Sequence, residues 1–394
     1  ADGTLSENDS EKTEEYTPHG IAVIGSDYLS SSVSIIDRHK KALSREGIIH
    51  SGSASPGLSI ALSGDIVFPL TPDEYGDIVI IDRYPNSVLN FLDANSFKLK
   101  KQLPVSTGFA SNPHDYLRLS TEKAYVTRYE KNPTPGDEEF DGGDDILIIN
   151  PQSFAISGRI DLSMVIADDT AQDLHVRPDR MIAAAEKVWV SCNFLNGDFN
   201  KGGKGLLLAI DPQNDEIIQS IEINEMSNCS GLTFNEENMT LYVSCSGMFS
   251  SDSYGQLEKS GIVAVDLSNA EPTYKIIAHA DDEEKRPYGF ELALAGSNTL
   301  LAVRFGDMDS DKKDQLTAID LGDNSHSVIH SASTPFGLGG FLYDRDSHTL
   351  YIGDADLNEP LIYLYDFSGG EFTATGTISS HPQSGLPPRH IAFF

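Results

Sequence analysis

The sequence predicts an all-β protein, a single seven-bladed β-propeller that takes up nearly all of its 394 residues. Short runs rich in β-branched and aromatic residues alternate with turn residues along the whole chain. The opening of a four-strand unit recurs at intervals of 48 to 65 residues. The two ends of the chain look like complementary parts of one such unit, so we expect them to close a ring.

The clearest unit lies in residues 111–161, where turn residues separate four β runs. In order, these runs are DYLRL, KAYVTRY, DILIINP and ISGRID. Their lengths and their β-branched and aromatic content are typical of strands. Four antiparallel strands in a stretch of this length make one propeller blade.

Other stretches repeat the opening of that blade as a short residue pair, a strand, a turn and a second strand. The copies are residues 177–193, 228–246, 286–307, 334–354 and 387–394. Residues 55–57, Ser-Pro-Gly, are expected to open a further copy. The third strand recurs as an apolar run that ends in Asp or Asn: DIVIID, DILIIN, GLLLAID, GIVAVD and QLTAID.

The last copy stops after one strand, PPRHIAFF, and the first part of the chain supplies what it lacks. Residues 19–49 read as strands two, three and four of a blade without a first strand. Sharing one blade between the two ends closes the ring and hides the first and last sheet edges. The domain is therefore expected to cover residues 19–394, with residues 1–18 as a flexible acidic tether.

Four motifs at the second strands are AYVTRYE, VWVSCN, LYVSC and LYIGD, each followed by an apolar strand that ends in Asp or Asn. In these motifs the chain resembles the seven-bladed YncE-like propellers, the YVTN-repeat class. The resemblance implies a propeller over residues 19–394. It also implies a function among those of the class, which includes extracytoplasmic binding proteins, surface-layer proteins and propeller subunits of redox enzymes. It carries over no catalytic residue.

The net charge and the N-terminal residue bear on the possible partners and on the cellular location of the protein. The formal charge of −32 repels nucleic acids and anionic membranes, so we expect neither as a partner. No run of 18 apolar residues is present, so no transmembrane segment is expected. The chain begins with Ala and not with Met. This start is expected of a secreted or lipid-anchored protein whose signal peptide has been removed, and the alternative is a trimmed sequence. We expect a periplasmic or cell-surface protein.

Three cysteines are present. Cys229 and Cys245 are nearly symmetric about a hairpin turn, so they should face each other across two strands and form a disulfide. Cys192 holds the place of Cys245 one blade earlier and is a rival partner for Cys229. Three buried free thiols are the alternative.

Calcium is the one cofactor that the sequence points to. Asp307, Asp309 and Asp311 alternate along an acidic loop, as calcium ligands do, but the loop lacks the downstream Gly and Glu of an EF-hand. A solvated acidic loop is the alternative. Residues 170–175 are expected to form a helical turn.

Superposing the blades predicts a binding site at the mouth of the central channel, where first strands begin and second strands end. Seven of the 12 arginines fall at these positions. Guanidinium groups bind carboxylates and phosphates, so we expect an arginine-lined funnel for an anionic ligand or an acidic peptide. The candidate ligand-binding residues are Arg83, Asn112, His114, Asp115, Arg128, Arg177, Asp179, Arg180, Arg286, Tyr288, Arg304, Arg389 and His390.

The alternative is that these arginines join the blades through ion pairs with acidic residues. The candidate partners are Asp115, Glu130, Asp179, Asp307 and Asp354.

Two functions from different classes remain open. The first is a non-catalytic binding or scaffolding propeller whose partner is a protein or a small anionic ligand. The second is a metal-dependent hydrolase or a redox-associated subunit, with His114, Asp115, Asp179 and His390 at the channel mouth. Neither G-x-S-x-G nor H-E-x-x-H occurs in the sequence.

Overall fold

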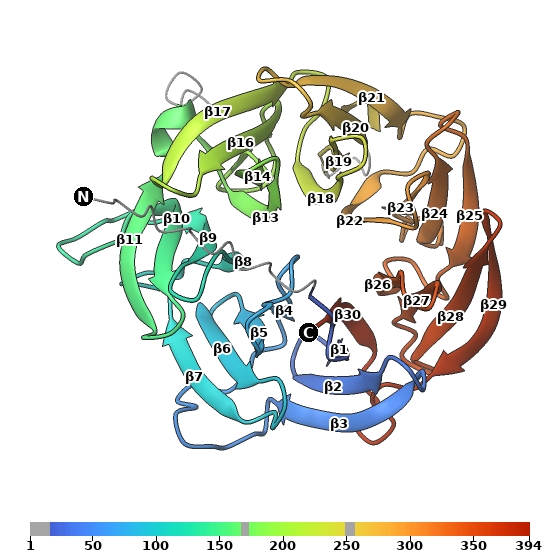
Figure 1. The fold of residues 1–394 in the computed structure, drawn as a ribbon, viewed down its shortest axis with the longest axis horizontal. Helices are drawn as coiled ribbons and strands as arrows, with labels where there is room; N and C mark the ends of the chain where they lie inside the picture. Colours follow the sequence, from blue (N-terminus) through green and yellow to red (C-terminus); the bar gives the residue numbers. More distant parts are fainter. Residues whose placement is uncertain (1–15, 167–172, 249–256) are drawn as a thin grey trace, which may run out of the picture.

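A computed structural model of the chain describes residues 16–166, 173–248 and 257–394. These residues form seven four-stranded antiparallel sheets arranged around a central axis (Figure 1). The predicted all-β, seven-bladed propeller is therefore confirmed. No helix in the described ranges has the length and apolar content needed to cross a membrane.

Each blade runs from an innermost strand at the channel to an outermost strand at the rim (Figure 1). Blade 1 consists of β30 (Pro388–Phe393), β1 (Ile21–Ser26), β2 (Ser31–Asp37) and β3 (Ala42–His50). Blade 2 consists of β4 (Ile66–Val67), β5 (Asp77–Asp82), β6 (Val88–Asp93) and β7 (Leu99–Pro104). Blade 3 consists of β8 (Pro113–Arg118), β9 (Ala124–Lys131), β10 (Gly143–Asn150) and β11 (Ala155–Asp161).

The remaining blades follow in chain order. Blade 4 consists of β13 (Pro178–Ala184), β14 (Lys187–Cys192), β16 (Gly205–Asp211) and β17 (Glu216–Ile223). Blade 5 consists of β18 (Cys229–Asn235), β19 (Thr240–Ser246), β20 (Ser260–Asp266) and β21 (Thr273–His279). Blade 6 consists of β22 (Tyr288–Leu294), β23 (Thr299–Arg304), β24 (Gln315–Asp320) and β25 (His326–Ser331). Blade 7 consists of β26 (Leu338–Asp344), β27 (Thr349–Asp354), β28 (Leu361–Ser368) and β29 (Glu371–Ile378).

Blade 1 is built from both ends of the chain. The C-terminal strand β30 pairs antiparallel with β1 from Ile21↔Phe393 to Gly25↔Pro388. This pairing leaves β30 as the innermost strand and joins it to β1–β3, the three N-terminal strands. The ring is thus closed by a hydrogen-bonded ladder inside one blade.

Blade 2 differs from the sequence expectation. Its first strand, β4, begins at Ile66 and not at residues 55–57, and DIVIID is its second strand, β5, not its third. In blades 3 to 6 the corresponding apolar runs are the third strands, as expected. Second and third strands are both buried on two faces, so both read as continuous apolar runs, and the pattern alone does not separate them.

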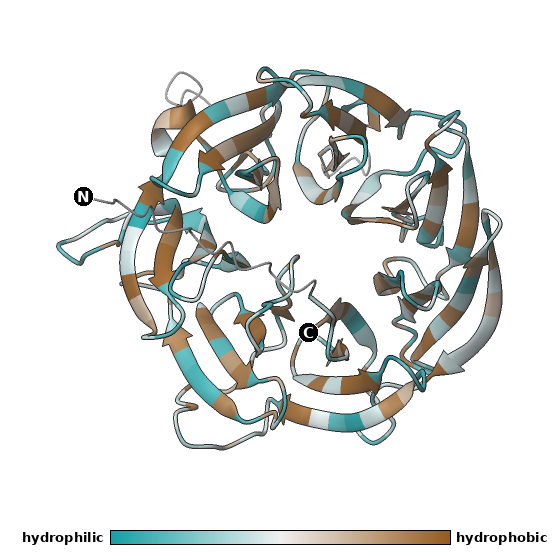
Figure 2. Ribbon diagram, viewed as in Figure 1, coloured by the Kyte–Doolittle hydropathy of each residue, from teal (hydrophilic) through white to brown (hydrophobic). Residues whose placement is uncertain are grey.

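The hydrophobic core lies between neighbouring blades. One cluster packs Tyr125 and Ile146 of blade 3 against Val188 and Leu208 of blade 4. The outermost strands alternate between exposed and buried residues, as in β17, and carry mixed colours in Figure 2. Burial between sheets fixes the orientation of each blade and, with it, the ring of strand ends at the channel.

Two expectations fall partly outside the described ranges. Of the expected tether, residues 1–15 are not described, and residues 16–18 have no regular secondary structure. Of the helical turn expected at residues 170–175, residues 170–172 are not described. The end of that stretch forms the short strand β12 (Leu174–His175), which pairs with β15 (Leu195–Asn196).

Candidate functional site

A cavity of about 550 Å³ lies at the centre of the ring, and all seven blades contribute to its wall. Its lining comes mainly from the starts of the innermost strands and from residues at or just after the ends of the second strands. These two places meet because the two strands run antiparallel. The volume falls within the range of small-molecule sites.

Bulges at the starts of the innermost strands place side chains in this cavity. In blade 4 the register between β13 and β14 shifts between Pro178 and Met181. In blade 6 the register between β22 and β23 shifts between Tyr288 and Leu292. Residues at such shifts, including Asp179, Arg180, Phe290 and Glu291, line the cavity. A bulge re-aims a side chain out of the regular alternation, so these irregularities build the site.

A hydrogen-bonded network joins blades 3, 4 and 5 at the cavity wall. His114 Nδ1 lies 2.8 Å from Asp179 Oδ1, and its ring stacks on Tyr129 with centroids 3.9 Å apart. The Tyr129 hydroxyl donates to Asn193 Oδ1 at 2.7 Å, and Asn193 Nδ2 donates to Asp179 Oδ2 and to Ser230 Oγ. His114 and Asp179 are therefore fixed in orientation at the cavity surface.

The protonation states of the two residues follow from this network. Burial opposes ionisation of Asp179, but the hydrogen bond from His114 and the charge of Arg180 outweigh it and lower its pKa to about 2. Burial lowers the pKa of His114 below its ordinary value of 6.5, despite the neighbouring carboxylate. An ionised Asp179 accepts only, so the neutral imidazole carries its proton on Nδ1. The unprotonated nitrogen, Nε2, can then act as a base, and His114 lines the cavity.

Three arginines line the cavity, and two of them are paired. Arg180 Nη1 donates to the carbonyl oxygens of Phe68 and His114 and lies 3.4 Å from Asp115 Oδ1. Arg83 donates from Nε and Nη2 to Asp65 Oδ1.

The third arginine, Arg389, differs from these two in its partners. It donates from Nε to Ser26 O and lies over the Tyr28 ring at 4.6 Å. Among the described residues, no ion pair is formed by Arg389.

A second carboxylate–histidine pair also lines the cavity. His390 Nε2 lies 3.4 Å from Glu291 Oε1. Burial raises the pKa of Glu291 to about 6. Burial, reinforced by the charges of Arg180 and Arg83, lowers the pKa of His390 to about 3. One cavity thus holds a carboxylate that stays ionised, Asp179, and one that is protonated on the acidic side of neutrality, Glu291.

Six of the predicted ligand-binding residues line the cavity: Arg83, His114, Asp179, Arg180, Arg389 and His390. The other seven do not: Asn112, Asp115, Arg128, Arg177, Arg286, Tyr288 and Arg304. Among the described residues, the charged side chains of the lining are Asp65, Asp179 and Glu291 against Arg83, Arg180 and Arg389. Their charges balance, so the expected arginine-lined basic funnel is replaced by a site of mixed charge.

A shift of one residue explains most of the second-strand misplacements. Arg128 and Arg304 pair with the first residues of their innermost strands and are buried away from the cavity, and Cys192 holds the equivalent position in blade 4. Successive side chains of a strand point to opposite faces, so the next residue faces the channel instead. The cavity is accordingly lined by Tyr129, Asn193 and Phe305, which the sequence analysis missed by one position.

The displaced arginines are paired, but the alternative, that they join blades, holds for Arg177 with Glu130 and not for Arg128 with Asp145, which both lie in blade 3. Arg128 pairs with Asp145 at 2.6 Å, Arg177 with Glu130 at 2.9 Å and Arg304 with Asp282 at 2.7 Å. Arg286 Nη1 donates to the carbonyl of Lys313. Of these partners only Glu130 was predicted from the sequence. Asp145 lies opposite Arg128 in the pairing of β9 with β10, and Asp282 lies in the connection between β21 and β22.

The remaining predicted residues have structural roles outside the cavity. Asn112 and Arg177 hold equivalent places just before β8 and β13, and both have a φ of 51°. Asparagine tolerates this left-handed conformation better than most residues, so Asn112 serves the turn. Asp115 accepts backbone hydrogen bonds from Leu70 and Met181 and links blades 2, 3 and 4. Tyr288 is buried beneath the Arg304 guanidinium.

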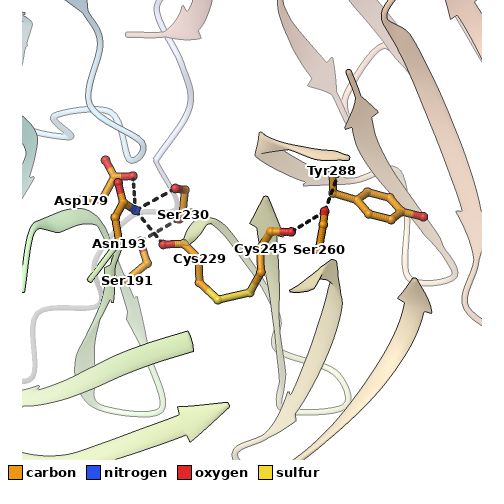
Figure 3. Close-up of a disulfide and its surroundings, with 8 residues drawn as sticks. All are labelled: Asp179, Ser191, Asn193, Cys229, Ser230, Cys245, Ser260 and Tyr288. Carbon is orange, nitrogen blue, oxygen red and sulfur yellow. Dashed lines mark hydrogen bonds between the residues drawn. A yellow bond between two sulfur atoms is a disulfide. The ribbon is translucent and has the colours of Figure 1, made fainter. Parts of the chain in front are cut away.

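A disulfide lies directly behind the network. Cys229 and Cys245 form it across β18 and β19, and Cys192 is a buried free thiol. Figure 3 shows the carbonyl oxygen of Cys229 accepting a hydrogen bond from Asn193, whose side chain also reaches Asp179 and Ser230. The disulfide thus fixes the strand start on which the network rests.

The structure does not assemble the expected calcium ligands. In the described part of the chain, no three His, Cys, Asp or Glu side chains are grouped as metal ligands would be. Asp307 instead accepts hydrogen bonds within its own loop, from the Asp309 N–H and the Ser310 hydroxyl, and pairs with Lys312 through the backbone. Such contacts are typical of a self-capped acidic turn.

No family model matches the chain, and no curated protein matches it. Solved structures share the fold at low identity. A protein from Bacteroides fragilis described as a putative 6-phosphogluconolactonase is 11% identical with a TM-score of 0.60, covering 95% of this chain and 97% of that one. The periplasmic gluconolactonase of Pseudomonas aeruginosa is 12% identical with a TM-score of 0.59, covering 95% and 98%. Hydrazine synthase of Kuenenia stuttgartiensis is 13% identical with a TM-score of 0.55, covering 80% of each chain.

Proposed function

We propose that the central cavity is the active site of a hydrolase that cleaves an ester or lactone bond. The observation that carries the proposal is the pair formed by His114 and Asp179, with Nδ1 2.8 Å from the carboxylate in a ring that lines the cavity. An imidazole oriented by an ionised carboxylate is a general base when its other nitrogen is free to accept a proton. That two structural neighbours are described as lactonases agrees with this chemistry.

In the proposed reaction, water is the nucleophile. His114 Nε2 takes a proton from water as the oxygen attacks the carbonyl carbon. Asp179 holds the imidazole in place and stabilises the imidazolium ion that forms. The guanidinium groups of Arg180 and Arg389 are the cationic donors available to the developing oxyanion. The carbon–oxygen bond then breaks to give an acid and an alcohol, which remain on one molecule when the substrate is a lactone.

Glu291 is the proposed proton donor to the leaving oxygen. Its pKa of about 6 keeps a fraction of it protonated near neutral pH, whereas Asp179 stays ionised. Two carboxyl groups whose pKa values are pushed apart in one site are typical of an acid and an orienting group. The imidazolium of His114 returns its proton to Glu291 through water, which restores both groups.

The test is hydrolysis of 4-nitrophenyl esters and of δ-lactones by the purified protein and its variants. Removing the base should lower kcat/KM by about 10²- to 10⁴-fold in His114→Asn, while the exposed-surface control His39→Asn keeps full activity. No hydrolysis of any ester or lactone by the wild type, or full activity of His114→Asn, would overturn the proposal.

The pH dependence gives an independent readout. His114 acts when neutral, so the rate should fall as pH drops through a value below 6.5. Glu291 acts when protonated, so the rate should also fall as pH rises through about 6. Glu291→Gln should lower the rate and remove the alkaline limb while leaving the acidic limb in place. An alkaline limb that persists in this variant would assign the proton donor elsewhere.

Arg389 favours a second candidate, a non-catalytic binding propeller for a small anionic ligand or a protein's acidic tip. Its guanidinium lies at the cavity wall over Tyr28 and has no carboxylate partner among the described residues. An unpaired guanidinium beside an aromatic ring is suited to a carboxylate. Calorimetric binding of a carboxylate that is lost in Arg389→Ala, without turnover of any ester, would favour this candidate.

An extracytoplasmic location belongs with either candidate, as in the YVTN-repeat propellers. It is supported by the disulfide, because such bonds persist in oxidising compartments. The test is mass spectrometry of the protein from its native cells after alkylation of free thiols. Alkylated Cys229 and Cys245 would contradict this location.

A further inference from the structure

Most of the ionisable side chains and most of the phenylalanines lie on different parts of the cavity wall. The ionisable side chains come mainly from blades 1 to 4, which provide Arg389, Arg83, His114 and Asp179. Blades 6 and 7 provide an apolar wall, made of Phe290, Val303, Phe305, Phe336 and Leu338. In Figure 1 the innermost strands β22 and β26 lie across the channel from β8 and β4. The polar and apolar walls therefore face each other.

The phenylalanines of the apolar wall contact one another and line the cavity. The rings of Phe290 and Phe305 are 5.2 Å apart, and those of Phe305 and Phe336 are 5.9 Å apart. Phe290 is 48% exposed and Phe336 is 43% exposed. Side chains of this size are normally buried, and apolar surface collected in a cavity is typical of a ligand site.

Glu291 lies between the apolar wall and the ionisable side chains of blade 1. It directly follows Phe290 in the bulge of β22, and its carboxylate lies against His390 of blade 1. A ligand that reaches His114 with its carbonyl group and Glu291 with its leaving oxygen would therefore have one end on the apolar wall.

From this arrangement we infer that the ligand is amphipathic: an ester or lactone whose carbonyl lies at the polar wall and whose aliphatic or aromatic chain of medium length lies on Phe290, Phe305 and Phe336. A sugar lactone would leave this wall in contact with hydroxyl groups and gain little from it. A cavity of about 550 Å³ has room for about 18 groups of the size of water, enough for a head group and a short chain. The inference rests on the proposed function for the identity of the bond, but not for binding.

The test separates binding from turnover. Calorimetry would measure the affinities of butyrate, hexanoate, octanoate and gluconate, which represent the acid products and are not hydrolysed. Affinity should rise several-fold with each pair of added methylenes, and gluconate should bind most weakly. Phe290→Ala and Phe336→Ala should each weaken octanoate binding by about tenfold or more. Butyrate binding should change little, because its chain is too short to cover the wall.

The matched control is Ile218→Ala, which truncates a side chain 47% exposed on the outermost strand β17. It should leave all four affinities unchanged. Equal binding of gluconate and octanoate, or a chain-length trend that survives both Phe→Ala changes, would overturn the inference. If octanoate binds but no ester is hydrolysed, the hydrolase proposal is wrong and the amphipathic ligand is supported. If esters are hydrolysed with no dependence on chain length, the hydrolase proposal is supported and the amphipathic ligand is wrong.

Discussion

His381 shows how one buried side chain makes this fold sensitive to pH. It lies in the connection between β29 and β30, is 2% exposed, and its Nε2 lies 3.1 Å from the Ser32 carbonyl oxygen. Its ring packs directly on Gly25, and a Cβ added to Gly25 would lie 2.8 Å from the ring. Burial lowers the pKa of His381 to about 4. The neutral ring is therefore part of the packing of blade 1.

His381→Gln should reduce the loss of stability in acid. Between pH 6.5 and about 4 the unfolded chain binds a proton at this histidine and the folded protein does not, so stability falls as pH falls. At about 1.4 kcal/mol for each pH unit, the wild type should lose about 2–3 kcal/mol at this residue between pH 7 and 4.5. Urea unfolding at both pH values measures the difference. It should shrink by that amount in His381→Gln and stay unchanged in the exposed control His39→Gln. An unchanged difference in His381→Gln would contradict the assignment.

At the scale of the strand, the disulfide between β18 and β19 supports both the blade and the site. It joins residues separated by 16 positions, and a loop of this length gives about 3 kcal/mol of stabilisation. Cys229 also accepts the hydrogen bond from Asn193, which in turn holds Asp179 (Figure 3). Loss of the bridge should therefore weaken the fold and loosen the orientation of the His114 base.

The double variant Cys229→Ser/Cys245→Ser should unfold at lower urea concentration, with a loss of about 3 kcal/mol. Ester hydrolysis should fall less than in His114→Asn, because the base remains. A reductant should lower the stability of the wild type and leave the double variant unchanged, whereas Cys192→Ala should still respond to reductant. An equal response of the double variant would mean that the reductant acts elsewhere.

Strands were easier to predict than the residues they present. Recurring apolar runs separated by turns follow from the burial of middle strands between blades, so the blades and the shared first blade could be predicted. An error of one residue in the strand register moves a side chain to the other face of the strand. For this reason Arg128 was expected at the cavity, where the structure has Tyr129. Glu291 and Phe290 were missed because Arg286 and Tyr288 were taken as the start of the first strand in blade 6, whereas the residues that reach the cavity lie two or three positions later, in the bulge of β22.

At the scale of the molecule, the ring depends on how the chain closes it. The ladder between β1 and β30 lies inside blade 1, and the last residue is close to the start of that blade, with His19 N–H donating to the Phe394 carbonyl at 2.6 Å. β30 also packs against β26 and β27 of blade 7. Two kinds of contact therefore hold the ends together: hydrogen bonds within blade 1 and side-chain packing between blades 7 and 1.

Circular permutants separate these two contributions. Both permutants join Phe394 to His19 through one short linker. Opening the chain at Gly369–Gly370, in the exposed turn between β28 and β29, leaves blade 7 shared between the new ends and closed by a ladder. Opening it at Ser384–Gly385, in the exposed connection before β30, makes every blade continuous, so only packing joins the new ends.

The permutant opened at Gly369–Gly370 should melt within a few degrees of the wild type, because ladder closure is kept. The one opened at Ser384–Gly385 should melt roughly 5–10 °C lower, since separation of blades 7 and 1 then breaks no backbone hydrogen bonds within a blade and frees chain entropy. Both should keep the cavity and so bind octanoate when folded, which controls for misfolding. If both melt together while binding the ligand, the packing between blades alone closes the ring, and the shared blade adds no stability to it.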